Sequence, residues 1–180
     1  MLGEINYFFK ISIFMKVAPY DENWPKIFQA EKELISSKLG GNFLDIQHIG
    51  STAIPAMSAK PIIDMAILIP SLDDAKKYLI PLGEIGYQFF KDRSSVERLF
   101  FVKGEPPKFH LSLAQPEKFS YWKRQILFRD YLIEHHDQAL EYEASKKCLI
   151  EKYPDIGQEY SDGKNEFVQK ILMLAENDKN

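Results

Sequence analysis

The sequence contains a single cysteine, Cys148, among its 180 residues. One thiol cannot form a disulfide within the chain, which excludes a small disulfide-bonded scaffold and is typical of proteins from a reducing cytoplasm. No stretch reaches the roughly 20 consecutive apolar residues that a membrane-spanning helix needs. Residues 1–14 are partly apolar, but Lys10 interrupts them and no small-residue cleavage site follows. We interpret residues 1–14 as a non-secretory extension and expect a cytoplasmic protein without a membrane partner.

A strong excess of positive charge is also lacking, since the formal net charge is -3. The charge is unevenly distributed: residues 91–129 hold nine Lys/Arg and four Asp/Glu, whereas residues 130–180 hold six and twelve. The basic middle segment would suit a phosphorylated small molecule, while the acidic last third argues against a long nucleic acid as partner. The alternative is that the basic residues of the middle segment lie on solvated surfaces. The sequence leaves both interpretations open.

Internal repeats, low-complexity tracts and interdomain linkers are absent as well. Hydrophobic residues make up 45% of the chain and charged residues 27%, which is typical of a soluble globular protein. A chain of this length can bury a sizeable core as one unit. We therefore expect residues 15–180 to form a single domain, and the sequence leaves its oligomeric state open.

Apolar periodicity and turn residues predict the secondary structure. The Gly-Glu-Pro-Pro segment between the last two strands favours an antiparallel hairpin. The expected fold class is α+β, with a mixed sheet of four or five strands, helices on one face and a helical C-terminal third. The predicted helices span 23–39, 71–82, 118–134, 137–152 and 156–176, and the predicted strands span 43–49, 61–69, 87–90, 96–103 and 109–114.

The stretch 48–64, HIGSTAIPAMSAKPIID, carries the features most indicative of a site. Glycine permits a tight turn and close approach of the backbone to a ligand, and the hydroxyls of Ser51 and Thr52 add donors beside Gly50 that suit phosphate oxygens. Asp64 is embedded in the apolar run PIIDMAILI. A buried carboxylate needs a hydrogen bond, a charged partner or a metal. We predict that the turn and Asp64 face one pocket.

Two histidines are candidates for the same pocket. His48 shares a strand face with apolar neighbours, as packed histidines do, but its place directly before the Gly-Ser turn also makes it a candidate ligand-facing group. His110 and Ser112 alternate with Leu111 and Leu113, so the two pairs face opposite sides of their strand. We predict that Asp64 and His110 lie across one pocket on adjacent strands.

The order of these features resembles the nucleotidyltransferase fold, in which a Gly-Ser turn follows one strand and a carboxylate lies on the next. More specifically, the chain resembles the GrpB family, a nucleotidyltransferase-like family whose biochemical role is undefined. The resemblance covers residues 15–175 and rests on the strings YDENWPKIF, HIGSTAIP, AKPIID, FHLSL, FRDYL and YSDGKNEF, in that order.

The resemblance implies that Gly50 and Ser51 form a phosphate-binding turn and that Asp64 is the first metal-binding carboxylate. The position two residues further, which is acidic in active transferases, is Ala66 in this chain. Magnesium is commonly held by one or two carboxylates together with substrate phosphates. We therefore expect at most one weak site for Mg or Mn.

Another divalent metal is the alternative. The strand that would supply a further carboxylate offers His110 and Ser112 instead. A metal site made of His48, Asp64 and His110 would suit a transition metal, because imidazole is a softer ligand than a carboxylate oxygen.

Two functions from different classes remain open. In the first, the protein is a nucleotidyltransferase: an NTP-like substrate lies on residues 50–52, Lys60 and Arg98 neutralise phosphate charge, Asp64 holds a divalent cation and His110 is a base or ligand. In the second, the protein is a non-catalytic relative that binds a nucleotide or phosphorylated metabolite and regulates a partner. A third possibility is that Asp64 is only an ion-pair partner of Lys60 or Arg98.

Arg129 and Lys164 lie in strings that resemble the family and are therefore candidates for nucleotide binding. Both come from the predicted C-terminal helices, where Arg, Lys and Asp side chains commonly form interhelical salt bridges. The sequence gives these two interpretations equal weight.

Overall fold

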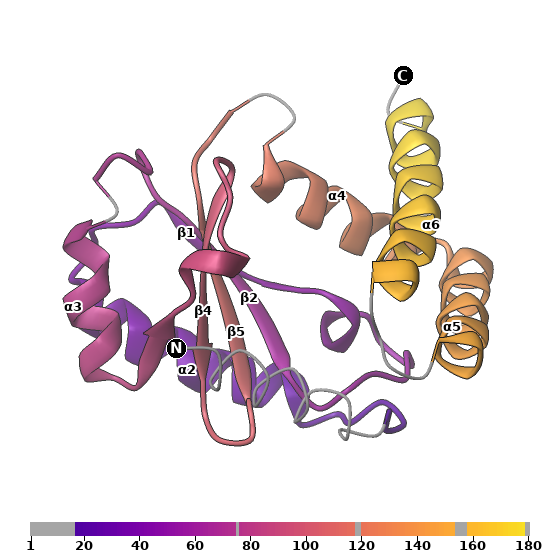
Figure 1. Cartoon of the computed structure of the whole chain (residues 1–180), viewed down its shortest axis with the longest axis horizontal. Coiled ribbons are helices and arrows are strands. Elements are labelled where there is room, and N and C mark those ends of the chain that lie inside the picture. The colour runs from indigo at the N-terminus through magenta and orange to yellow at the C-terminus, as the bar shows by residue number, and fades with distance from the viewer. Residues whose placement is uncertain (1–16, 75, 118–119, 154–157, 179–180) are drawn as a thin grey trace.

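The structure, a computed structural model, describes residues 17–74, 76–117, 120–153 and 158–178. The predicted extension, residues 1–14, lies outside the described residues. Figure 1 shows the arrangement of the elements. The helices are α2 (Trp24–Leu39), α3 (Lys76–Glu84), α4 (Tyr121–Glu134), α5 (His136–Lys152) and α6 (Gln158–Asn177), and the strands are β1 (Asp45–Ile49), β2 (Ile63–Leu68), β3 (Tyr87–Phe89), β4 (Arg98–Lys103) and β5 (Phe109–Ala114), with short 3-10 turns η1 (Ser51–Ala53) and η2 (Lys91–Arg93).

The five strands form one mixed sheet in the order β1-β2-β5-β4-β3. Strands β2 and β5 are parallel, and the other neighbouring pairs are antiparallel. The predicted mixed sheet and the predicted β4–β5 hairpin are therefore confirmed. The parallel pair has a direct consequence for the site, because it makes Asp64 and His110 register partners although 46 positions separate them.

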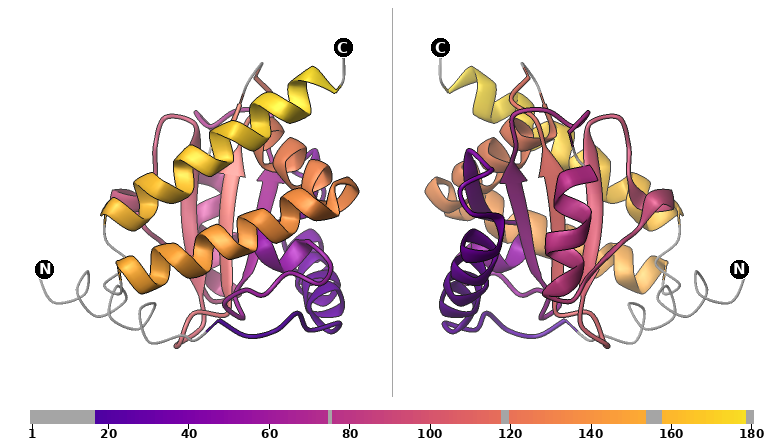
Figure 2. Two further views of the ribbon diagram at one scale, coloured as in Figure 1. Left: turned by 90° about the vertical axis from the view of Figure 1, so that its right-hand side faces the viewer. Right: turned by 90° about the vertical axis from the view of Figure 1, so that its left-hand side faces the viewer.

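Helices α2 and α3 cover one face of the sheet, as Figure 2 shows in its right-hand view. The core on this face joins alternate strand residues to apolar residues of both helices. Its fully buried members include Ile35 of α2, Leu82 of α3, Met65 of β2 and Leu111 of β5. These residues follow the periods of 3.6 and 2 that distinguish helices from strands, which explains why the sequence predicts this layer.

On the other face, α4 packs directly on one end of the sheet. Trp122 of α4 packs there against Ile49, Ala66 and Ala114. Helices α5 and α6 lie side by side in front of the sheet (Figure 2, left), and their apolar residues pack on α4 and on each other. Away from α4, this face carries Asp64 of β2, His110 of β5, and Arg98 and Phe100 of β4.

Two local details concern the starts of helices. Asn23 occupies the N-cap position of α2, at the predicted start of this helix, but its side chain makes no capping hydrogen bond; instead, Asp21 Oδ1 accepts hydrogen bonds from the Asn23 backbone and side chain at 2.8 and 2.9 Å. Helix α3 is described from Lys76, later than the predicted start at residue 71, and Ser71 Oγ accepts a hydrogen bond from the Asp73 amide in the turn before the helix. No helix in the described part of the chain has the length and apolar character to cross a membrane.

Candidate functional site

A cavity of about 440 Å³ lies between the sheet face that α4 contacts, the segment after β1, and helices α4, α5 and α6. Its lining is strongly cationic. Two carboxylates, Asp64 and Glu143, contribute to it. The lysine and arginine side chains that line it come from the loop before β2, from η2, from β4, and from α5 and α6: Lys60, Arg93, Arg98, Lys146, Lys147 and Lys164.

Gly50 forms the turn at the base of this cavity. Its backbone has φ 71° and ψ -171°, a combination that is essentially restricted to glycine. A Cβ atom at this position would lie 2.7 Å from Asp64 Oδ2. The Asp64 carboxylate therefore sits directly against the turn, and both features face one cavity as predicted.

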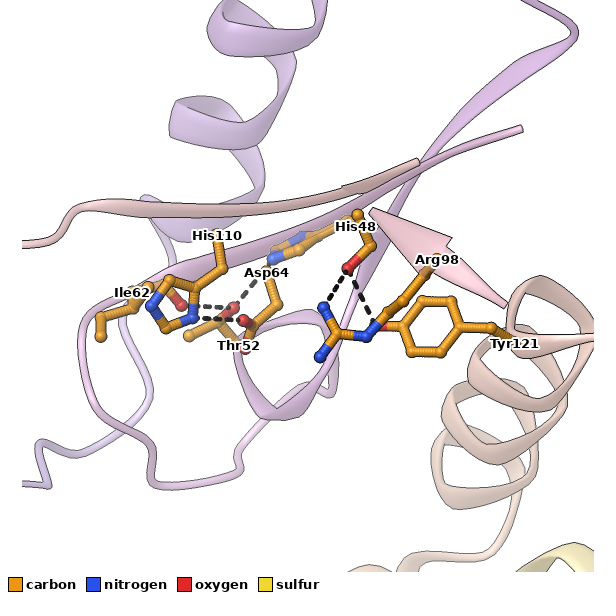
Figure 3. A network of polar contacts seen from close by, with 8 residues as sticks. His48, Thr52, Ile62, Asp64, Arg98, His110 and Tyr121 are labelled. Atoms are coloured by element: carbon orange, nitrogen blue, oxygen red, sulfur yellow. Dashed lines mark hydrogen bonds and ion pairs between the residues drawn. The ribbon is translucent and has the colours of Figure 1, made fainter. Parts of the chain in front are cut away.

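Asp64 and His110 point toward each other from β2 and β5 (Figure 3), and His110 Nδ1 lies 3.0 Å from Asp64 Oδ1. The predicted geometry of this pair is confirmed. The Asp64 side chain is 39% exposed toward the cavity and that of His110 is 19% exposed. Burial opposes ionisation of Asp64, but the His110 hydrogen bond and the charges of His110 and Lys164 keep its pKa below the ordinary value.

The pairing selects one tautomer of neutral His110. An ionised carboxylate can only accept hydrogen bonds, so the proton of neutral His110 lies on Nδ1 and is donated to Asp64. Nε2 then carries the lone pair. Because His110 lines the cavity, this nitrogen belongs to an imidazole that is oriented by a carboxylate and accessible to a ligand.

The prediction that His48 shares a metal with Asp64 and His110 is wrong. In the β1–β2 register His48 pairs with Met65, whereas Asp64 pairs with Ile49, so His48 projects from the opposite face of the sheet. The His48 ring stacks on the Phe28 ring with 4.9 Å between the ring centroids, and burial lowers the pKa of His48 to about 4. The described residues contain no group of three or more His, Cys, Asp or Glu side chains that could hold a metal.

Thr52 links His48 to the rim of the cavity. Its hydroxyl lies 2.9 Å from His48 Nε2 and donates to the Ile62 carbonyl at 3.4 Å, as Figure 3 shows. The Thr52 side chain lines the cavity but is buried. Its hydroxyl proton is therefore used within the protein, and Ser51 is the better placed of the two predicted donors.

Arg98 lies in the cavity, as expected for a phosphate-neutralising group, and is held by aromatic rings. Its guanidinium donates to Ser112 Oγ at 3.5 Å and lies 5.2 Å from the Tyr121 ring centroid. Arg93, which the sequence analysis missed, lies 4.1 Å from the Phe100 ring, and Arg98 lies 4.7 Å from the same ring. Burial and then the nearby charge of Arg98 lower the pKa of Arg93. The two arginines thus concentrate positive charge beside β4.

Lys60 reaches the cavity as predicted, and Lys164, for which the sequence left two interpretations open, reaches it as well. Burial, followed by the charge of Lys164, lowers the pKa of Lys60. The pKa of Lys164 is raised, chiefly by Tyr142 and further by Tyr160 and Asp64, although desolvation acts in the opposite direction. Lys164 therefore remains protonated at neutral pH and provides a fixed positive charge from α6.

Lys146 of α5 is a second residue that the sequence analysis missed. Its Nζ donates to Ser51 Oγ and to the Ser58 carbonyl, both at 3.1 Å. Helix α5 has only a weak amphipathic pattern, so its sequence does not reveal which lysines face the sheet. The sequence feature that could have pointed to this residue is the pair of adjacent lysines, Lys146 and Lys147. Such pairs are equally common on exposed helix surfaces, so this feature does not identify a site.

The structure places Arg129 outside the cavity. Its Nη1 donates to the His48 carbonyl and to Gln47 Oε1, both at 2.8 Å, and its Nε donates to Asp130. Helix α4 packs against β1 at this point, and these hydrogen bonds join the two elements. Arg129 therefore has a structural role, in line with the salt-bridge interpretation of its helix.

Comparison with known proteins identifies the family. The model of the family described as GrpB protein matches residues 15–173. The chain belongs to the GrpB family. It is 40% identical over 169 residues to a UPF0157 protein of Pseudomonas aeruginosa, a match that covers 89% of this chain and 67% of the relative.

Two further relatives agree with this assignment. The glutamate-rich protein GrpB of Alkalihalophilus pseudofirmus is 37% identical over 158 residues, which cover 85% of this chain and 91% of the relative. The crystal structure of the conserved protein GrpB from Enterococcus faecalis has a TM-score of 0.80 and 29% identity, and the match covers 89% of this chain and 96% of that chain. The resemblance seen in the sequence motifs is thus confirmed.

The residues of this GrpB chain do not fit a preformed site for a divalent cation. Among the described residues, the carboxylates that line the cavity are Asp64 and Glu143; one oxygen of Asp64 already accepts from His110, and Glu143 forms an ion pair with Lys147. Ala66, the next residue of β2 on the same face as Asp64, is fully buried beside Trp122, so a carboxylate there would lie under α4. Magnesium favours several hard oxygen ligands in near-octahedral geometry, which this donor set does not supply.

Proposed function

We propose that this GrpB protein binds a nucleotide or another phosphorylated small molecule with the phosphate groups inside the cavity. The observation that carries the proposal is the charge of the lining, where six lysine and arginine side chains face two carboxylates. Like charges that are partly removed from water repel one another more strongly than they do in water. A polyanion would relieve this repulsion, whereas a cation or a neutral ligand would not.

The arrangement of the site supports a phosphate ligand in particular. The Gly50 turn lets a ligand approach the backbone closely, and the Ser51 hydroxyl lies beside it. Arg98 supplies a planar guanidinium, which suits two phosphate oxygens at once, while Lys60 and Lys164 supply point charges. The charges come from several elements around the cavity, so a small phosphorylated molecule fits this geometry better than an extended polymer does.

Replacing Arg98 with glutamine is expected to weaken the binding of ATP, used as a probe, by about tenfold or more, because a hydrogen bond to a charged group contributes roughly 1.5–3 kcal/mol. Binding is measured by isothermal titration calorimetry. Arg124→Gln is the matched control, because Arg124 forms an ion pair with Glu97 and does not line the cavity. Equal weakening by both changes would indicate a non-specific loss of positive charge and would contradict the proposal.

Nucleotidyl or phosphoryl transfer is the second candidate function, and the Asp64–His110 pair favours it. In this scheme His110 Nε2 removes the proton of an acceptor hydroxyl, whose oxygen attacks a phosphorus atom of the bound ligand. The bond to the leaving phosphate breaks, and the cavity cations stabilise the negative charge on that phosphate. Asp64 holds the imidazole in the required tautomer and stabilises its protonated form.

His110→Gln separates the two functions. Glutamine keeps a side-chain donor for Asp64 but cannot act as a base, so ATP affinity should change by less than about threefold while turnover falls by about 100-fold or more. Turnover is followed as phosphate or pyrophosphate release from nucleoside triphosphates in the presence of hydroxyl acceptors. Undiminished turnover in this variant would exclude His110 as the base, and a wild-type protein that binds without turnover would leave the binding function alone.

A further inference from the structure

Lys146 connects α5 to the turn at the base of the cavity. Its Nζ lies 3.1 Å from both Ser51 Oγ and the Ser58 carbonyl, at the two ends of the segment that follows β1. The same Nζ lies 4.7 Å from the centroid of the Tyr142 ring. These three contacts of the ammonium group are with uncharged partners, and Lys146 lines the cavity.

The charged groups near Lys146 are mostly positive. On its own helix, the charge of Glu143 favours the protonated form of Lys146, but Glu143 forms an ion pair with Lys147 at 2.7 Å and the positive charge of Lys147 acts in the opposite direction. From α6, Lys164 lowers the pKa of Lys146 through its positive charge. The segment that follows β1 contributes Ser51 and Ser58 to this contact, which are uncharged.

The remaining charges of the cavity lie further along its wall. Asp64 of β2 is bonded to His110 of β5, and the loop before β2 contributes another cation, Lys60. The surroundings of Lys146 therefore hold an excess of positive charge. An anion between α5 and α6 would reduce this excess.

We propose that Lys146, Lys164 and the Ser51 hydroxyl bind the phosphate group that carries most of the ligand's negative charge, and that Lys146 takes up a proton when this group binds. The inference rests on the proposed function and adds the location of the phosphate and its coupling to pH. The group that binds at this position is a phosphate dianion. A nucleotide and an inorganic phosphate compound can both supply it. The link between α5 and the turn makes Lys146 sensitive to occupancy of the cavity.

The protonation step follows from the environment of Lys146. Burial, and then the charge of Lys164, lower its pKa to about 8, so close to half of the molecules carry a neutral Lys146 at that pH. A bound dianion favours the ammonium form and raises this pKa. Binding at about pH 8 should therefore take up about half a proton per ligand at Lys146. At about pH 6.5 the uptake should vanish, because Lys146 is already protonated.

Calorimetric titrations of the full chain test the inference, with ATP and inorganic pyrophosphate as separate probes. Proton uptake is obtained from the dependence of the binding enthalpy on the ionisation enthalpy of the buffer. Lys146→Arg keeps the positive charge but does not titrate in this range, so it should bind the probe and lose the additional uptake of about half a proton at pH 8. Titration of the probe itself is common to both proteins and cancels in the comparison.

Lys146→Gln should weaken binding about tenfold, and Lys152→Gln, a control at the exposed end of α5, should bind like the wild type. Thermal unfolding establishes that each variant is folded, and Lys164→Gln tests the same phosphate position from α6 if the Lys146 variants do not fold. The relative affinities of the two probes show whether the phosphate belongs to a nucleotide or to an inorganic compound.

The outcomes separate this inference from the proposed function. If Arg98→Gln weakens binding but Lys146→Gln does not, the cavity binds phosphate elsewhere and the inference is overturned. Equal proton uptake by the wild type and Lys146→Arg at about pH 8 would overturn the protonation step. If the wild type binds neither probe, the proposed function and the inference both fail.

Discussion

Replacement of Gly50 by alanine is expected to lower the free energy of unfolding by about 2–4 kcal/mol and to abolish ligand binding in the cavity. Two independent effects contribute. The backbone at φ 71° and ψ -171° is strained for any residue with a side chain. The new methyl group would also lie 2.7 Å from Asp64 Oδ2, so the carboxylate would have to move and its bond to His110 would be disturbed.

Gly40→Ala is the matched control for this change. Gly40 also has a positive φ, 58°, but a Cβ atom there would meet nothing within 4 Å. Its substitution should cost about 1 kcal/mol from backbone strain and leave ligand binding intact. Urea denaturation measures the stability of both variants, and ATP titration measures their binding. Equal losses of stability in the two variants would show that the contact between Gly50 and Asp64 has no energetic consequence.

Acidification is expected to destabilise the fold through His48. Burial lowers the pKa of His48 from 6.5 to about 4 in the folded state. The folded protein therefore favours the neutral ring, and this contribution to stability is complete above about pH 6.5 and is lost as the pH falls toward 4. At about 1.4 kcal/mol per pKa unit, the loss over this range amounts to roughly 3 kcal/mol.

The variant His48→Gln isolates this effect, because glutamine retains a donor for Thr52 but has no ionisation in this range. The stability difference between the wild type and this variant should shrink by about 2–3 kcal/mol between neutral pH and about pH 4, as measured by urea denaturation. Contributions from the other carboxylates are present in both proteins and cancel, and His48 is the weakest of the groups that lower the pKa of Asp64. His136→Gln, at an exposed position, serves as the control. A parallel pH dependence of the wild type and His48→Gln would show that His48 ionises freely in the folded state.

Much of the fold could be predicted from the sequence because its elements follow clear local rules. The alternation of His110 with Leu111 determined which side chains of β5 face the core, and the same period placed Asp64 on the matching face of β2. The turn between β4 and β5 fixed their antiparallel pairing. The three C-terminal helices were predicted with boundaries within a few residues of those observed.

The site was less predictable where it depends on packing between distant elements. The position of Lys146 follows from how α5 packs against α4 and α6, which a weakly amphipathic sequence does not encode. Arg129 was predicted as a candidate for ligand binding because it lies in a string that resembles the family. In the structure it donates to a backbone carbonyl of β1 and lies outside the cavity. Strand alternation already indicated that His48 lies on the same buried face as Ile46. The metal prediction was wrong because it gave too much weight to the position of His48 beside the Gly-Ser turn.

The central claim is that the cavity binds phosphate through its positive charge, and the most direct test compares ATP with adenosine in calorimetric titrations of the wild-type protein. The account predicts that ATP binds at least about 100-fold more tightly than adenosine, because most of the binding energy comes from the phosphates. It also predicts that ATP affinity falls severalfold between about 50 and 200 mM salt, since the interaction is electrostatic and is screened. Similar affinities for ATP and adenosine, or an ATP affinity that does not change with salt, would contradict it.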